Sequence, residues 1–302
     1  MEKFIKKILV FLIIPIITGG AVFLVFVICL SNASSECQIK SNIKHVYIGD
    51  SHIKQAINDS IIPNSLNIAA NSESFYFSYY KLEVLLNNNP SIENVYLGFS
   101  YHSLSNYYDR FINGDYSSAI ATKYFYILTP KEQIRMIYWN KTNLVPFMKS
   151  VIKHGFIELL RNDCSSFLGG YSNHFNTTSA VNSSMDKRLT FQYYNNGRLN
   201  PFSEINIEYL NKIVLLCKSK DVKLYTLNTP LYEYYAEKVP EKYKEKLQEI
   251  INESQINYID LSNLEFKREY FIPDGDHVSK LGAEATSVEL NKARTHNNVY
   301  KK

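Results

Sequence analysis

An uncharged apolar segment near the N-terminus, Ile8 to Leu30, constrains this chain more than any other part of its sequence. A helix of about 23 residues, rising about 1.5 Å per residue, is long enough to cross a hydrocarbon core of roughly 30 Å. Three lysines and one acid precede the segment, so the positive-inside bias places the N-terminus in the cytoplasm. We predict a cytoplasmic stub at 1–7, a transmembrane anchor at 8–30 and an extracytoplasmic remainder, in a single-pass protein of the cell membrane.

Three other interpretations of this segment stay open. A cleaved signal peptide fits the small residues Ser31 and Ala33, although the apolar core of such a peptide normally has only about 7 to 15 residues. A lipoprotein anchor would use Cys29, but Ile28 precedes it where a small residue is expected. A buried core helix would be unusual, because helices that are apolar all round at this length are uncommon in soluble folds.

The composition of the 302 residues is that of a globular protein. Hydrophobic residues make up 45% and charged residues 21%, which excludes a disordered, collagenous or multi-span membrane chain. The net charge is only +4 and there is no dense basic run, so no nucleic acid partner is expected. The four cysteines show no CxxC spacing, so neither a zinc ribbon nor a disulfide scaffold is predicted.

Alternating short strands and helices predict an α/β domain after a polar linker at 31–43. This alternation favours a three-layer, doubly wound parallel sheet with helices on both faces, whose active site lies beyond the carboxyl ends of the strands. The domain occupies 44–295, followed by a tail at 296–302. The predicted strands are 45–49, 65–69, 95–98, 222–227 and 258–261, and the predicted helices are 75–86, 205–219, 241–252 and 279–292.

Residues 101–201 interrupt this alternation. We predict helices at 131–139 and 144–160, whereas 162–200 is rich in Ser, Asn and Gly and is predicted to be mainly loop. Because the alternation resumes afterwards, we interpret this segment as an insertion into one domain and not as a second core.

The first predicted strand leads directly into Gly49-Asp50-Ser51-His52. A serine in a sharp turn between a strand and a helix presents its hydroxyl at the carboxyl end of the sheet, where the helix N-terminus stabilises negative charge. The non-catalytic alternative is that Ser51 only caps the helix, as serine often does. The hydroxyl becomes a nucleophile only with a base, usually a histidine that a carboxylate orients.

Such a base is available near the C-terminus, in Pro273-Asp274-Gly275-Asp276-His277. Asp274 and His277 are three residues apart, so in a tight turn the carboxylate could hold the imidazole Nδ1–H while Nε2 faces Ser51. We expect Asp276 to be unable to do this easily from the adjacent position. The non-catalytic alternative for His277 is a solvated histidine at the start of a helix.

Together, Gly49-Asp50-Ser51 and Asp274-x-x-His277 resemble the SGNH/GDSL hydrolase superfamily, over most of residues 44–292 apart from the insertion. The Gly-Asp-Ser-His form, the single anchor and the external domain look most like its membrane-tethered branch, which is associated with O-acyl groups on cell-envelope polysaccharides. Relatives there include alginate acetylation proteins and the protein that acts in D-alanylation of teichoic acid. The resemblance implies that Ser51 is the nucleophile, His277 the base and then acid, and Asp274 its orienting carboxylate.

The resemblance also implies an oxyanion hole formed by the serine N–H, a glycine after the second strand and an asparagine in a Gly-x-Asn-Asp segment after the third. Here Asn71 or Ser72 occupies the second turn, and Ser100 stands where the asparagine would be. The candidates are therefore Ser51, Asn71 and Ser100, and either Ser100 or His102 would take the place of the missing asparagine. One lost donor costs about 10² to 10³ in rate, so either these residues substitute or the activity is reduced.

Four further residues lie at the ends of predicted strands and are candidates for the pocket: Asp50, His52, Gly98 and His102. We expect Asp50 to tighten its own turn, and both histidines are of a type that more often serves local hydrogen bonding than catalysis. A metal site made by Asp50, His52, Asp274 and His277 would lack HExxH-type spacing. We expect no metal and no cofactor.

These residues predict an extracytoplasmic serine esterase or O-acyltransferase, with O-acetyl as the expected group, acting on a cell-envelope polysaccharide. Water as the acceptor would give an esterase, and a sugar hydroxyl would give a transferase. The expected partners are an acylated polysaccharide or small acyl ester, the membrane, and a membrane-bound acyl donor. The alternative is a non-catalytic SGNH-like protein that binds a polysaccharide or an assembly partner, as the missing Gly-x-Asn-Asp suggests.

Overall fold

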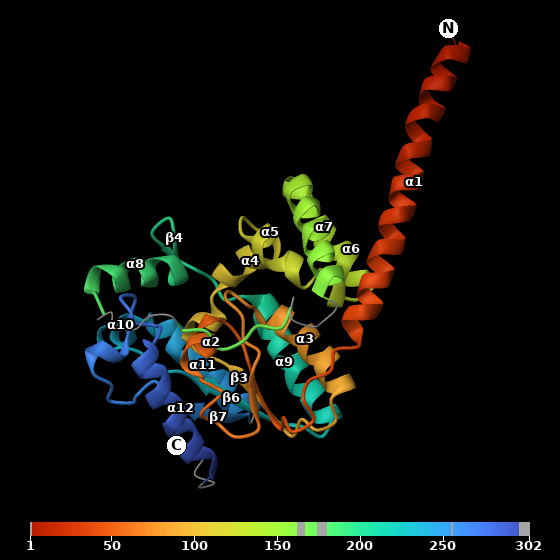
Figure 1. Cartoon of the computed structure of the whole chain (residues 1–302). Coiled ribbons are helices and arrows are strands. Elements are labelled where there is room, and N and C mark those ends of the chain that lie inside the picture. The colour runs from red at the N-terminus through yellow and green to blue at the C-terminus, as the bar shows by residue number, and fades with distance from the viewer. Residues whose placement is uncertain (1, 162–166, 174–179, 255, 296–302) are drawn as a thin grey trace.

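A long N-terminal helix projects from a folded α/β domain (Figure 1). The computed structural model describes residues 2–161, 167–173, 180–254 and 256–295. Helix α1 spans Glu2–Ser35, and its part from Ile13 to Ser35 is long and apolar enough to cross a membrane. The predicted tail at 296–302 lies outside the described residues.

The centre of the domain is a five-stranded sheet in which every neighbouring pair is parallel. Its order is β2-β1-β3-β6-β7. The predicted α/β fold class is confirmed, and the five predicted strands are the five observed ones within a few residues at their ends. Their bounds are His45–Ile48 for β1, Ser65–Asn67 for β2, Asn94–Gly98 for β3, Lys223–Asn228 for β6 and Asn257–Asp260 for β7.

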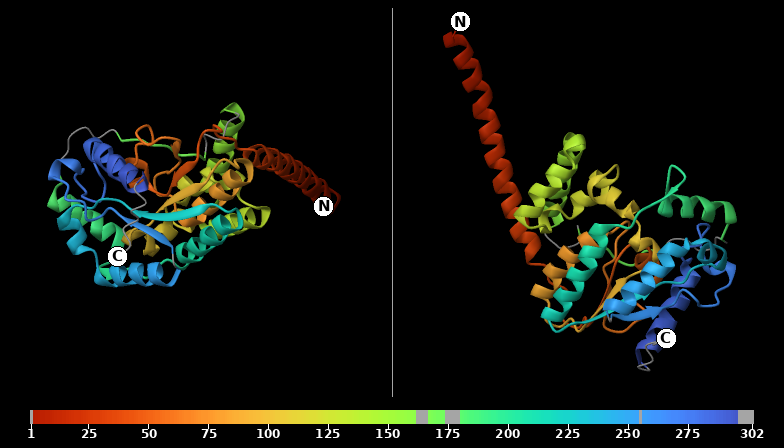
Figure 2. Two further views of the ribbon diagram at one scale, coloured as in Figure 1. Left: turned by 90° about the horizontal axis from the view of Figure 1, so that it is seen from below. Right: turned by 180° about the vertical axis from the view of Figure 1, so that it is seen from behind.

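Helices cover both faces of this sheet (Figures 1 and 2). On one face α3 (Phe75–Asn88) packs against α9 (Glu204–Ser219), and α11 (Glu241–Ser254) lies on the same side as α9. On the other face the short α2 (Ser51–Ala56) packs against α12 (Lys280–Thr295). The remaining small elements of this part are α10 (Glu233–Lys238) and η7 (Arg268–Tyr270).

The segment between β3 and α9 is an insertion made mainly of helices. The two helices predicted here are observed as α6 (Pro130–Trp139) and α7 (Leu144–Arg161). The loop predicted at 162–200 was wrong in part, because α8 (Asn182–Tyr193) and a short hairpin of β4 (Tyr194–Asn195) and β5 (Arg198–Leu199) lie within it. Residues 162–166 and 174–179 lie outside the described residues. α8 is mostly polar, and it is held by the burial of Met185, Leu189 and Tyr193 along one side. The elements are η1 (Tyr101–Leu104), η2 (Asn106–Tyr108), α4 (Asp109–Asn113), α5 (Ser117–Ile120), η3 (Ala121–Lys123), η4 (Phe125–Ile127), α6 (Pro130–Trp139), η5 (Lys141–Asn143), α7 (Leu144–Arg161), α8 (Asn182–Tyr193), β4 (Tyr194–Asn195) and β5 (Arg198–Leu199).

The polar linker predicted at 31–43 is shorter than expected, because α1 continues past Leu30 to Ser35. Leu30, Ser34 and Cys37 are buried against the domain. Cys37 forms a disulfide, whereas Cys29 and Cys217 are free. The domain therefore packs directly on the end of α1 and does not hang on a free tether.

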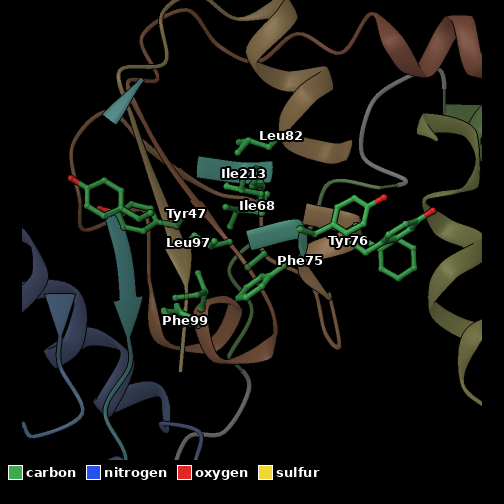
Figure 3. Packing of buried hydrophobic residues seen from close by; sticks show 14 of the residues in the cluster. Tyr47, Ile68, Phe75, Tyr76, Leu82, Leu97, Phe99 and Ile213 are labelled. Atoms are coloured by element: carbon green, nitrogen blue, oxygen red, sulfur yellow. The ribbon is translucent and has the colours of Figure 1, made fainter. Parts of the chain in front are cut away.

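The many aromatic residues belong largely to the core, as Figure 3 shows for Tyr47, Phe75, Tyr76 and Phe99. Tyr47, Tyr96 and Tyr225 occupy matching positions on three neighbouring strands. Their rings stack across the sheet, with centroids 4.7 and 5.0 Å apart. Parallel register thus accounts for this part of the unusual tyrosine content.

Two glycines shape the crossing from β1 into α2. Gly49 has φ +143°, a conformation that side chains rarely adopt, and a Cβ there would lie 3.2 Å from the Gly98 nitrogen. A Cβ on Gly98 would lie 2.5 Å from the Ile53 side chain on α2. Both positions therefore need glycine for the turn that carries Ser51 to lie close against β3.

We predict that Gly49→Ala lowers the free energy of unfolding by about 1 to 3 kcal/mol, because the new side chain strains the backbone and meets β3. Gly170→Ala is the matched control, since a Cβ there would have only one neighbour, 3.9 Å away. Thermal unfolding of the full chain in detergent measures both. Equal stability of the two variants would contradict the proposed strain.

Candidate active site

Ser51 is the first residue of α2 and stands at the point where the order of the sheet reverses. From β1 the chain passes to β2 on one side, and β3 lies on the other side of β1. Two neighbouring connections therefore diverge above the carboxyl ends of β1 and β3, which is where open α/β sheets bind ligands. Ser51 is partly exposed there.

The structure brings together the three residues predicted as a triad. His277 Nε2 lies 2.8 Å from Ser51 Oγ, and His277 Nδ1 lies 2.8 Å from Asp274 Oδ2. The second oxygen of Asp274 accepts the His277 backbone N–H at 3.2 Å. With Nδ1–H donating to Asp274, Nε2 is free to accept the Ser51 proton, which is the arrangement that activates a serine.

Asp276 lies beside the same ring but does not hold its Nδ1–H, because Asp276 Oδ1 has no hydrogen-bond partner among the described residues. Its Oδ1 lies 3.1 Å from His277 Nδ1, so two carboxylates face the same ring nitrogen. Asp276 is fully buried, whereas the Asp274 side chain is 24% exposed. The contact arises because the chain turns sharply at Gly275, with φ +70°.

Asp276 also gathers three donors on its other oxygen. Oδ2 accepts Arg188 Nε at 2.7 Å and Gln192 Nε2 at 2.9 Å, and it lies 3.2 Å from His52 Nε2. Arg188 and Gln192 come from α8, inside the predicted loop, and sequence reasoning missed both. Their only sequence signal was the spacing of apolar residues along α8, which does not single out an arginine.

Asp50 anchors a second set of side chains beneath the serine. Its Oδ1 accepts the His52 backbone N–H at 2.9 Å, which is the predicted tightening of the turn. Its Oδ2 lies 2.7 Å from His102 Nε2 and accepts the Tyr108 hydroxyl. A buried carboxylate needs such partners, because it has lost its hydration.

The three histidine rings of the site lie against one another. His52 stacks on His102 with centroids 3.9 Å apart and an interplanar angle of 24°, and its centroid lies 4.5 Å from that of His277. Each histidine has its own carboxylate: Asp274 for His277, Asp276 for His52 and Asp50 for His102. Of the predicted pocket residues, His52 and His102 are thus part of the buried support of the triad.

The charges of the neighbouring carboxylates determine the protonation state of His277. Burial opposes protonation of His277, but the negative charges of Asp276 and Asp274 outweigh it and raise the pKa of His277 to about 10. Burial alone would raise the pKa of Asp276, but Arg188 and His277 hold it well below its usual range. His277 is therefore a strong proton acceptor whose neutral form becomes more abundant as the pH rises.

His52 and Asp50, beside the triad, both have lowered pKa values. Burial and the proximity of His102 lower the pKa of His52 to about 4. Burial would raise the pKa of Asp50, but His52 and His102 and the hydrogen bonds from His102 and Tyr108 hold it below its usual range. At neutral pH the Asp50 carboxylate is therefore ionised and the His52 ring is neutral.

The remaining oxyanion candidates occupy different environments. Asn71 is exposed, next to Ser72 with φ +58°. Ser100 is buried; its N–H donates to Ser103 Oγ at 3.2 Å, and its own hydroxyl is a buried atom without a hydrogen-bond partner. Gly98 serves the close approach of α2 and β3 described above. None of these contacts tests a role as an oxyanion donor, so the assignment of Asn71 and Ser100 stays a prediction.

A metal ion would compete with the contacts already made. Two groups of possible ligands lie close together among the described residues, Asp50-His52-His102 and His52-Asp276-His277. Their donor atoms are engaged with one another, and Arg188 adds a positive charge 2.7 Å from Asp276 Oδ2. The expectation that no metal takes part stays a prediction.

Comparisons with known proteins give similarity in structure only. No protein-family model and no curated protein matches the sequence. Solved structures that resemble it include a Streptococcus pneumoniae protein named for platelet activating factor, with 11% identity, a TM-score of 0.41 and 91% coverage of both chains. A GDSL-like lipase from Bacteroides thetaiotaomicron has 8% identity and a TM-score of 0.37, with coverage of 86% of this chain and 91% of its own. A Bacteroides fragilis protein assigned as an acylhydrolase has 10% identity and a TM-score of 0.36, with coverage of 86% and 90%.

We predict that the reactivity of Ser51 toward a serine-directed phosphonate rises with pH through a midpoint well above 6.5, the ordinary value for histidine. Only neutral His277 accepts the serine proton, and the two carboxylates favour its charged form. Asp276→Asn removes one of these charges and should shift the midpoint to lower pH. Asp186→Asn, an exposed carboxylate of α8 that pairs with Lys238, should leave it unchanged. A wild-type midpoint near 6.5, or equal midpoints in all three proteins, would contradict this account.

Proposed function

We propose that this chain is a membrane-anchored member of the SGNH/GDSL hydrolase superfamily. It is an extracytoplasmic serine esterase or O-acyltransferase that acts on acyl esters, with O-acetyl groups on a cell-envelope polysaccharide as the proposed substrate. The observation that carries the proposal is the relay from Ser51 through His277 to Asp274, with two distances of 2.8 Å, at the carboxyl end of the sheet.

The relay supports a two-step acyl transfer. Ser51 Oγ attacks the acyl carbonyl while its proton passes to His277 Nε2, and the carbonyl oxygen becomes an oxyanion. The ester C–O bond then breaks, and His277 returns the proton to the leaving alcohol. An acyl-serine remains on the enzyme.

The second step reverses the roles of the groups. Water or a sugar hydroxyl attacks the acyl-serine, His277 takes its proton, and the proton then returns to Ser51 Oγ as the acyl group leaves. Water gives hydrolysis and a sugar hydroxyl gives transfer. Asp274 and Asp276 stabilise the charged ring that forms in each step, since both lie within 3.1 Å of Nδ1.

Oxyanion stabilisation begins with the Ser51 N–H at the start of α2. Asn71 is the proposed second donor, because it lies exposed in the turn after β2. Ser100 is the third candidate through its unpartnered hydroxyl. Two or three such donors in a low-dielectric site usually contribute the largest share of acyl-transfer catalysis.

Two features support a location outside the cytoplasm. α1 is long and apolar enough to span a membrane, and three lysines in its first two turns precede the apolar segment. Cys37, directly after this helix, forms a disulfide, and disulfides persist mainly in oxidising compartments. A polysaccharide of the envelope and a membrane-bound acyl donor are the proposed partners.

We predict that an epitope tag added at the C-terminus is digested by external protease in spheroplasts, while a tag added at the N-terminus is protected. The reason is the charge asymmetry across the span. Protection of the C-terminal tag until the membrane is permeabilised would reverse the topology.

One observation favours a second candidate, a non-catalytic protein that binds a polysaccharide or an assembly partner. The Ser100 N–H is already bonded to Ser103, and no asparagine occupies that position. A protein short of oxyanion donors could keep the fold and the triad geometry and yet turn over little substrate.

Ser51→Ala distinguishes the two candidates. We predict that the wild type hydrolyses an aryl acetate and is labelled by the phosphonate at Ser51, and that Ser51→Ala loses labelling and at least about 10³-fold of the rate. Ser219→Ala, at the end of α9 far from the site, is the matched control and should keep both. Neither turnover nor labelling in the wild type would favour the non-catalytic candidate.

A further inference from the structure

Exposed apolar side chains gather on one part of the insertion. Phe156 is 56% exposed and Leu160 is 85% exposed, although large apolar side chains of this kind usually lie in the core. Neighbouring α6 contributes further side chains of this kind. We define the α6–α7 apolar face as Ile134, Tyr138, Leu144, Val145, Ile152, Phe156, Leu159 and Leu160.

This face lies beside the end of the membrane-spanning helix. Figures 1 and 2 show α7 next to the lower part of α1 from opposite sides. The Phe156 and Phe26 rings are 5.5 Å apart. Gly155 allows this approach, because a Cβ there would lie 2.8 Å from side-chain atoms of Phe26 and Leu30.

The contact with Phe26 sets the depth of α7 relative to the membrane. Phe26 lies four residues before Leu30, the end of the predicted span, which is about 6 Å along a helix. An exposed side chain that packs on Phe26 is therefore level with the apolar span. The bilayer that surrounds α1 would also surround the apolar face of α7.

The charges around the face fit a membrane surface. Four exposed lysines lie on or between α6 and α7, at positions 131, 141, 149 and 153, whereas the two acids of residues 130–161, Glu132 and Glu158, are buried. Lys141 Nζ lies 4.6 Å from the centre of the exposed Tyr138 ring. Lysines beside exposed aromatic and aliphatic residues are typical of helices that lie in the interface of an anionic bilayer.

We propose that the α6–α7 apolar face enters the outer leaflet next to α1, and that lipid, with its anionic headgroups on the lysines, is its partner. This rests on the proposed membrane anchoring by α1. The domain then has two membrane contacts, and they fix the orientation of the Ser51 site relative to the bilayer. A single helix with a free linker would not do so.

The test uses the full chain reconstituted in vesicles of phosphatidylcholine and phosphatidylglycerol with brominated acyl chains, which quench nearby tryptophan. The only tryptophan, Trp139, is first replaced (Trp139→Phe). Phe156→Trp and Val145→Trp then report on the face, and Val145→Trp avoids the contact with Phe26. Val22→Trp, on an exposed position of α1, reports on anchoring. Leu215→Trp is the matched control, because Leu215 is 64% exposed on α9 away from α1.

We expect the tryptophans at positions 156, 145 and 22 to lose roughly half of their emission or more in brominated vesicles, and the one at position 215 to keep it. Quenching at 22 without quenching at 156 and 145 would overturn the proposal while leaving the anchor intact. Absence of quenching at all positions would overturn the anchoring as well, whereas phosphonate labelling of Ser51 is measured independently of both.

Discussion

Two buried carboxylates, Asp50 and Asp276, impose the arrangement on which the site depends. A carboxylate without water must be paired, and leaving one partner out is costly. Asp50, in the turn after β1, pairs with His102 and accepts the hydroxyl of Tyr108, both from the insertion. Asp276 accepts a hydrogen bond from Arg188 of α8 and lies next to His52 and His277. Segments more than a hundred residues apart are therefore held around one serine by the need to neutralise two charges.

The insertion consequently has two tasks. Its first and last parts complete the buried network, through His102 and Tyr108 at one end and Arg188 and Gln192 at the other. Its middle part, α6 and α7, packs on the end of α1 and presents the apolar face. A hollow at the amino ends of β3 and β6, lined by residues such as Pro90, Asp221 and Lys223, lies at the opposite edge of the sheet from Ser51. The Ser51 site thus lies at the carboxyl edge of the sheet, next to the first and last parts of the insertion.

Most of the fold could be predicted because its signals are local. The strands are short apolar runs bounded by turn residues, and the order of strands and helices leaves few topologies. α8 could not be predicted in this way, since it is polar and forms because Met185 and Leu189 find buried surface in the folded domain. For the same reason Arg188 was missed, although its guanidinium is the strongest donor to Asp276. Local spacing also did not indicate that Asp276 Oδ1 would lie 3.1 Å from His277 Nδ1 as a charged neighbour without a hydrogen bond to it.

The residue pattern alone predicts the long apolar helix, the α/β class and the candidate triad of Ser51, Asp274 and His277, because each prediction rests on short runs of residue types. The folded structure was needed to show that these three residues meet, that Asp276 lies beside the His277 ring, and that His52 stacks on His102. Only the structure also placed α7 against α1. These are contacts between residues far apart in the chain, and their energies come from burial and charge pairing that exist only once the chain has folded.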